Sequence, residues 1–131
     1  MTLAIKAGPS RGRLYKLFTD LGPYFRKLQS TQESFFFDCL EICVDPEKAP
    51  EEREFYGWWL VVTQNETGYH YQRADGLYDL CGNWIEKSVS AEQQKQLDKS
   101  FQLFIKRLDT LIEVETNRPL ISLQEEIVTT V

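Results

Sequence analysis

The sequence predicts an α+β domain in which an antiparallel sheet of about four strands is flanked by an N-terminal and a C-terminal helix. Two observations carry this prediction. Apolar residues recur at helical spacing near both ends of the chain. The stretch between the ends holds short runs of aromatic and branched side chains, separated by turn residues, which is typical of strands. The 131 residues suffice for one domain, with residues 1–9 and 118–131 as tails that are either flexible or docked.

The first predicted helix begins after Ser10, a residue type that favours the N-cap position, and extends to about Leu21. Its apolar positions fall on one face of a helix with 3.6 residues per turn. Gly22-Pro23 interrupts the pattern, because proline cannot continue a helix. We therefore expect a second short helix with Pro23 in its first turn, extending to about residue 29.

Residues 33–45 and 55–63 are the strongest strand predictions, because both are rich in aromatic and β-branched side chains. The charged loop between them includes Pro50 to Arg53, which could form one helical turn. Residues 64–68 contain a glycine and are expected to form a hairpin loop of the longer type.

Two further strands are predicted from the next apolar and aromatic residues. Residues 69–73 alternate in polarity, and residues 77–81 are expected to return as a fourth strand. Asp75-Gly76 between them is interpreted as a tight turn. A bend at residues 81–83 precedes Trp84.

The C-terminal helix has the clearest start signal in the chain. Ser90 at the N-cap and Gln93 three residues later form a capping box. Apolar residues then recur every three or four positions, which predicts a helix to about Glu115 that ends before Pro119. The segment from Leu120 onward is mildly amphipathic and is either docked or frayed.

Composition excludes several classes of protein. The chain is 42% hydrophobic, too apolar for wholesale disorder, and its longest apolar run is far shorter than the ~20 residues of a membrane span. The start lacks the features of a secretory signal, so a cytoplasmic location is expected and a membrane partner is not. Three cysteines, Cys39, Cys43 and Cys81, are an odd number and fit a disulfide framework poorly.

Charge argues against a nucleic-acid partner. The net charge is −5, and residues 33–131 hold nine basic and nineteen acidic residues. Phosphate neutralisation by Lys and Arg dominates binding to nucleic acids, so an acidic body disfavours it. Residues 1–32 hold six basic residues and one acidic residue. Polyanion binding by this basic N-terminal helix is the least favoured function, because the helix can instead lie against the acidic remainder of the chain.

No catalytic, metal or cofactor site is predicted. The three cysteines and His70 have suitable atoms for zinc, but Cys39 and Cys43 on one strand would lie ~13 Å apart. Glycine-rich phosphate loops are absent. One alternative stays open: a small-molecule-binding protein or small enzyme with a pocket near Cys81, His70 and Asp79. Asp38 and Glu41 lie in an apolar strand, where a carboxylate either has a specific partner or guards a strand edge.

The favoured function rests on the two apolar strands. In both strands the residues that point to one face and those that point to the other face are apolar. A sheet with one face in water should instead alternate apolar and polar residues. Two helices cover one face, so the other is either covered by residues 23–29 or the tail, or binds a partner. We predict a non-enzymatic protein-interaction or accessory domain that uses an aromatic sheet face and self-associates, with a dimer expected. The predicted protein-binding residues are Trp58, Trp59, Tyr69, Tyr71, Arg73 and Trp84.

Overall fold

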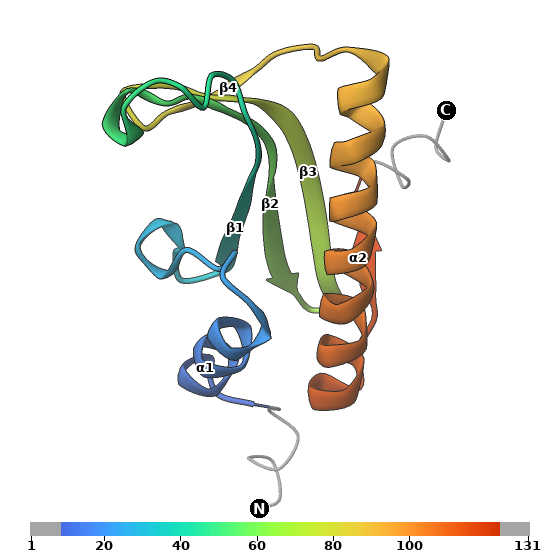
Figure 1. Ribbon diagram of the computed structural model, residues 1–131. Helices are drawn as coiled ribbons and strands as arrows, with labels where there is room; N and C mark the ends of the chain where they lie inside the picture. Colours follow the sequence, from blue (N-terminus) through green and yellow to red (C-terminus); the bar gives the residue numbers. More distant parts are fainter. Residues whose placement is uncertain (1–8, 124–131) are drawn as a thin grey trace, which may run out of the picture.

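The computed structural model describes residues 9–123. It has the predicted α+β architecture, with two α-helices and a five-stranded sheet (Figure 1). The elements in chain order are α1 (Arg11–Leu21), η2 (Lys27–Gln29), β1 (Ser34–Cys43), η3 (Pro50–Glu52), β2 (Phe55–Asn65), β3 (Gly68–Tyr78), β4 (Trp84–Glu86), α2 (Ala91–Thr116) and β5 (Leu120–Ser122).

The sheet is mixed rather than purely antiparallel. Strands β1 to β4 are antiparallel neighbours in chain order, and β5 pairs in parallel with β3. On the outer edge of β3, β5 pairs with Tyr69 to Tyr71 and β4 pairs with Gly76 to Tyr78. The first part of the C-terminal tail is thus docked as a strand, whereas residues 124–131 lie outside the described residues.

Both predicted helices have the expected caps. The Ser10 side chain accepts a hydrogen bond from the Arg13 amide at the start of α1. Ser90 and Gln93 form the complete capping box of α2, which ends at Thr116 before the left-handed residue Asn117. These local signals fix where each helix begins because they satisfy amide groups that have no partner within the helix.

The predicted second helix after Pro23 is wrong. Phe25 instead forms a β-bridge with Phe37, and only the 3-10 turn η2 follows. The Asp38 amide donates to the Tyr24 carbonyl (2.9 Å), and the Arg26 amide donates to the Phe36 carbonyl (2.8 Å). This extended segment satisfies backbone groups on the edge of β1, which a helix would leave unpaired.

The predicted turn at Asp75-Gly76 is also wrong, because β3 continues through both residues to Tyr78. A Cβ atom on Gly76 would lie 2.0 Å from the carbonyl oxygen of Ile85. The glycine therefore serves close approach of the β4 backbone and not a reversal of the chain. As a consequence, residues 77–81 are not a separate strand.

The β2–β3 hairpin is tighter than predicted. Asn65 pairs with Gly68, which leaves a two-residue loop in place of the longer one. The Asn65 carboxamide oxygen accepts hydrogen bonds from the amides of Thr67 and Gly68 and from the Thr67 hydroxyl. The Asn65 side chain thus satisfies the backbone amides of the turn, so the turn needs no additional loop residues.

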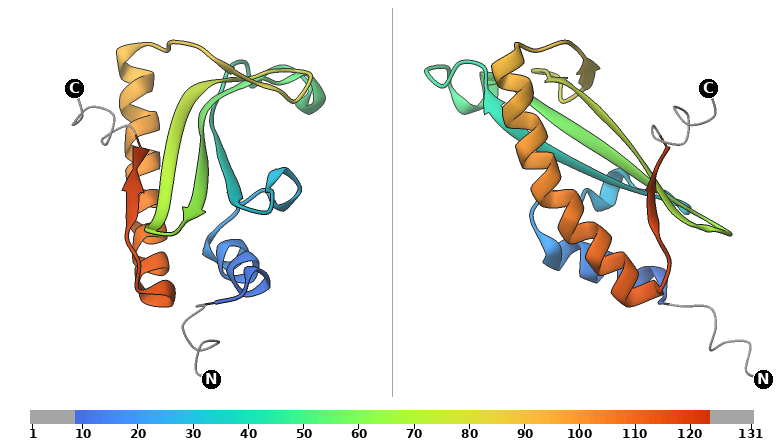
Figure 2. Two further views of the ribbon diagram at one scale, coloured as in Figure 1. Left: turned by 180° about the vertical axis from the view of Figure 1, so that it is seen from behind. Right: turned by 90° about the vertical axis from the view of Figure 1, so that its right-hand side faces the viewer.

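The core lies between one face of the sheet and the two helices (Figure 2). Phe18 of α1 packs edge-on against Phe35 and Phe37 of β1, and Phe37 also contacts Phe104 of α2. Because Phe35 and Phe37 project from the same face, both helices cover that face, which we call the helix face. Among the described residues, neither α-helix lies over the opposite face, which we call the outer face.

Candidate protein-interaction surface

The six residues predicted to bind a partner do not share one face. Trp58 and Tyr69 are core residues with exposures of 0% and 2%. Trp58 packs against three aromatic rings of the helix face, those of Tyr24, Phe101 and Phe104, and its indole Nε1 donates to Ser100 Oγ (3.2 Å). Neighbouring strand residues point to opposite faces, so Trp58 and Trp59 are separated by the pleat.

Arg73 connects the sheet to α2. Its guanidinium donates to Asp75 (2.8 and 2.9 Å) and to Asp98 (2.8 Å), and it lies 4.5 Å from the ring centroid of Phe101. Burial alone would raise the pKa of Asp98. The hydrogen bonds from Gln94 and Arg73 and the charge of Arg73 together lower it by more, so the pKa of Asp98 is below its usual value. Arg73 therefore stabilises helix packing.

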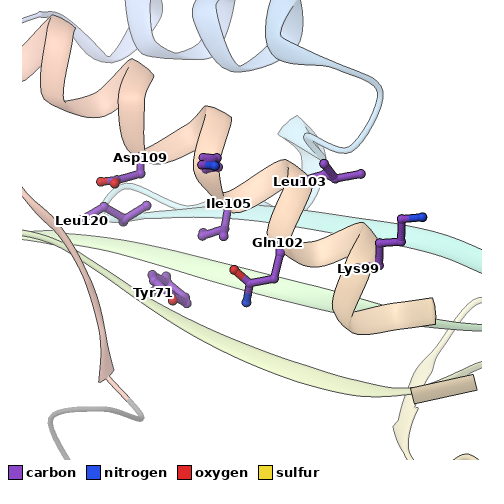
Figure 3. A pocket seen from close by; sticks show the side chains of 8 residues that line it. Tyr71, Lys99, Gln102, Leu103, Ile105, Asp109 and Leu120 are labelled. Atoms are coloured by element: carbon purple, nitrogen blue, oxygen red, sulfur yellow. The ribbon is translucent and has the colours of Figure 1, made fainter. Parts of the chain in front are cut away.

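Tyr71 lines a groove between α2 and β5 (Figure 3). The groove has a volume of about 440 Å³, and its apolar part is contributed by Tyr71, Leu103, Ile105 and Leu120. In Figure 3 the side chains of Ile105 and Gln102 point from α2 toward the sheet, while that of Lys99 points away. The groove is a shallow feature of the helix face and does not include Trp59 or Trp84.

Trp59 and Trp84 are the two predicted residues that meet on the outer face. Their rings are stacked with centroids 4.7 Å apart and an interplanar angle of 29°, and Tyr78 packs edge-on against Trp84 at 5.2 Å. Gly57 makes room for this arrangement, because a Cβ atom there would lie 2.9 Å from Cη2 of Trp84. The Trp84 side chain of the short strand β4 thereby lies over β2.

Asp38 lies beneath this aromatic pair with only 5% exposure. Its Oδ1 accepts a hydrogen bond from Arg26 Nε (2.5 Å), and its Oδ2 accepts one from Trp84 Nε1 (2.9 Å). The sequence left open whether a carboxylate in this apolar strand has a specific partner or guards a strand edge, and in the structure both oxygens of Asp38 have a partner. We call Trp59, Trp84, Asp38 and Arg26 the outer-face cluster.

Exposed apolar side chains surround the same end of the sheet. Their exposures are 37% for Leu40, 45% for Val44, 57% for Leu80 and 47% for Ile85. Leu40 pairs with Gly57 and therefore shares the face of the outer-face cluster. Ile85 is the neighbour of Trp84 along β4, so its side chain points to the opposite face at the same end of the sheet. We call these four residues the apolar rim. A stacked tryptophan pair with an apolar border is the composition expected of a protein-binding surface.

His70 lies far from the other two residues of the alternative pocket, Asp79 and Cys81. His70 is buried at the hairpin end of β3, where its Nδ1 lies 2.8 Å from Asn65 Nδ2. Asp79 and Cys81 follow the other end of the strand, and the run from His70 to Tyr78 spans roughly 26 Å. Asp79 accepts hydrogen bonds from the amides of Cys81 and Asn83, which shapes the loop before β4. The geometry thus offers no thiol–imidazole pair.

The cysteines are free thiols in different environments. Burial raises the pKa of Cys39, whose Sγ lies 3.6 Å from Ser100 Oγ and 3.6 Å from a Glu41 oxygen. Burial likewise raises the pKa of the neighbouring Tyr24 hydroxyl.

Within residues 9–123, no group of three or more histidine, cysteine, aspartate or glutamate side chains is arranged to hold a metal ion.

Several basic residues near the N-terminus are paired within the chain. Arg11 donates to the carbonyls of Gln32 and Ser34, Arg13 binds Glu115 (3.0 Å), and Lys16 lies 3.3 Å from Asp20. Of these contacts, the Arg13–Glu115 pair joins the basic segment to an acidic residue of the remaining chain. In the part of the chain that the structure describes, no helix is long and apolar enough to cross a membrane.

The chain is similar in sequence to proteins of a known family. The family model described as "Sigma factor-binding transcriptional regulator Crl" matches residues 1–129. The sigma factor-binding protein Crl of Photobacterium profundum is 44% identical over 105 residues, which cover 80% of this chain and 79% of that protein. Its counterpart in Vibrio vulnificus is 36% identical over 106 residues (80% and 82%), and that in Vibrio cholerae is 36% identical over 100 residues (76% and 78%).

Proposed function

Because this chain belongs to the Crl family of sigma factor-binding transcriptional regulators, we propose that it binds a sigma factor through the outer-face cluster and the apolar rim. A protein-binding regulatory role, as opposed to an enzymatic one, follows from the family. The location of the binding surface is our proposal. A sigma factor as partner also agrees with the cytoplasmic location that the sequence predicts.

One observation carries the proposal: the stacked pair of Trp59 and Trp84 lies on the face that neither α-helix covers. Of the seven large hydrophobic residues that are exposed among the described residues, the four of the apolar rim lie at this end of the sheet. Tryptophan is enriched among the residues that contribute most to binding, because a large rigid ring loses little conformational entropy on docking. A partner that covers these rings would also remove Leu40 from water, because Leu40 has the same strand parity as Asp38 beside them.

The test measures binding to purified sigma factors by titration calorimetry. Trp84→Ala and Trp59→Ala should each raise the Kd for the cognate sigma factor about 30-fold or more, which corresponds to the ~2 kcal/mol of an interface hot spot. Leu103→Ala and Val114→Ala are the matched controls, because these apolar residues of α2 are 64% and 73% exposed and lie away from the outer face. They should leave the Kd within about twofold.

Equal Kd values for wild type and both tryptophan variants would contradict the proposed surface while leaving family membership intact. Loss of binding by the Leu103 or Val114 variant, with the tryptophan variants unaffected, would move the surface to α2. Each variant is first checked for a cooperative urea transition, so that unfolding is not counted as lost binding.

Self-association is a second candidate use of the same surface. The residues of the apolar rim are 37% to 57% exposed, so a contact between two copies would remove apolar side chains from water when no partner is present. Native mass spectrometry at low micromolar concentration should then show a dimer that Trp84→Ala weakens and that an added sigma factor replaces. A wild-type monomer at these concentrations would remove self-association from the proposal and leave sigma factor binding unaffected.

A further inference from the structure

We propose that Asp38 is a positioning residue, which holds the Trp84 ring in its binding orientation against Trp59 through the Oδ2 to Nε1 hydrogen bond. The inference deepens the proposed function, because it rests on Trp84 contacting the partner. Asp38 itself is buried and would not touch the partner; its effect would pass through the indole.

The position of Trp84 needs such a contact because β4 is weakly held. The strand has three residues and pairs only with the end of β3. The residues on both sides of Trp84, 80–83 and 85–88, are exposed. In the strand order, β4 and β1 lie on opposite sides of β2 and β3, so the hydrogen bond between Trp84 and Asp38 reaches across the outer face.

A tryptophan ring that only stacked could rotate about its side-chain torsions without losing all of its apolar contact. A hydrogen bond from Nε1 to a fixed acceptor restricts these torsions, since the indole has a single donor. Asp38 is a fixed acceptor because it belongs to the central part of β1 and is almost fully buried. One bond therefore selects the orientation in which the Trp84 ring lies on Trp59.

Arg26 donates a hydrogen bond to the other carboxylate oxygen of Asp38 and so fixes the orientation of that side chain. The Arg26 side chain is 38% exposed and that of Asp38 is 8% exposed, so the carboxylate has lost most of its contact with water while the guanidinium keeps part of its own. The Arg26 backbone is itself held by the hydrogen bond to the Phe36 carbonyl. With both oxygens bound, the buried negative charge is compensated and the side chain cannot turn away from Trp84.

The test uses the circular dichroism of two coupled indoles as a readout that needs no partner. Two tryptophan rings stacked at 4.7 Å should give an exciton couplet in the far ultraviolet, and Trp59→Phe should abolish it and so identify it. Asp38→Leu keeps the branched shape of the side chain but removes the acceptor, whereas Asp38→Asn keeps one acceptor oxygen, which can accept from Trp84 Nε1 when the carboxamide NH2 faces Arg26. We expect Asp38→Leu to lose most of the couplet and to raise the sigma factor Kd tenfold or more, while Asp38→Asn retains the couplet and binds within about threefold of wild type.

The matched control is Asp98→Asn, which removes an aspartate bonded to an arginine on the helix face and should change neither the couplet nor the Kd. A full couplet in Asp38→Leu, or its equal loss in Asp38→Leu and Asp38→Asn, would overturn the proposal. If Asp38→Leu does not fold, Asp38→Asn decides alone, and loss of its couplet overturns the positioning role. Failure of the proposed function is a separate result: Trp84→Ala would then bind the sigma factor as wild type does.

Discussion

Gly57 and Gly76 face each other across β2 and β3, and each leaves space on the outer face that part of β4 fills. The Trp84 ring lies over Gly57, and the Ile85 carbonyl lies over Gly76. A pair of glycines inside two long strands weakens each strand, since glycine loses more conformational entropy on folding than any other residue. Here that loss permits β4 to fold back over the sheet and present Trp84 beside Trp59.

Replacement of Gly57 by alanine should therefore lower stability. The added Cβ would lie 1.9 Å from the Cys39 carbonyl oxygen and 2.9 Å from Trp84 Cη2, so the backbone and the ring must both move. We expect a loss of about 1–3 kcal/mol or more in the free energy of unfolding, measured by urea denaturation. Gly12→Ala is the control, because the nearest atom to its Cβ is 4.0 Å away in α1. It should leave stability unchanged or raise it by up to ~1 kcal/mol. Equal transitions for the two variants would refute this packing argument.

The adjacent residues Trp58 and Trp59 should respond very differently to truncation. Trp58 is fully buried, so Trp58→Ala should cost ~3–5 kcal/mol in the free energy of unfolding. Trp59 keeps part of its surface in water, and Trp59→Ala should cost clearly less because less area returns to solvent. Urea transitions with matching m-values test this order. A larger loss for Trp59 than for Trp58 would mean that the two faces of β2 are reversed.

The comparison of these two residues also shows what the sequence could predict. Both helices and the two aromatic strands follow from local periodicity and caps, and the structure confirms them. The strand period of two also requires Trp58 and Trp59 to point to opposite faces, so the predicted single binding face could not include both. Which of them is buried depends on where the helices pack, and that is not a local property.

Long-range contacts account for the errors. Asp75-Gly76 has the composition of a tight turn, and only its closeness to β4 explains why it lies inside a strand. Pro23 correctly indicated a break, but pairing of the following residues with β1 replaced the expected helix. Asp38 was conspicuous as a carboxylate in an apolar strand. Its partners Arg26 and Trp84 come from segments far away in the chain, which spacing alone cannot identify.

The Arg73–Asp98 contact predicts a dependence of stability on pH. The folded-state pKa of Asp98 is lowered: burial opposes ionisation, but the bonds from Gln94 and Arg73 and the charge of Arg73 outweigh it. A carboxyl group with a lowered folded pKa is protonated first in the unfolded chain, so acid favours unfolding. The stability that Asp98 contributes is fully present above about pH 4, the usual aspartate pKa, and is lost as the pH falls through the lower folded value.

Asp98→Asn should therefore have a lower urea midpoint than wild type at pH 7, and this difference should shrink as the pH falls below about 4. The effect is modest, because the Asp98 side chain is 52% exposed and solvent screens the pair. Asp20→Asn provides the control, since both partners of the Lys16–Asp20 pair are exposed, at 76% and 62%. Its midpoint should stay close to that of wild type at every pH, as expected of a surface ion pair. In an Arg73→Met background the Asp98→Asn difference should also decrease, because the charge and one donor are gone. A difference that stays constant from pH 7 to pH 3 would show that Asp98 contributes by packing alone.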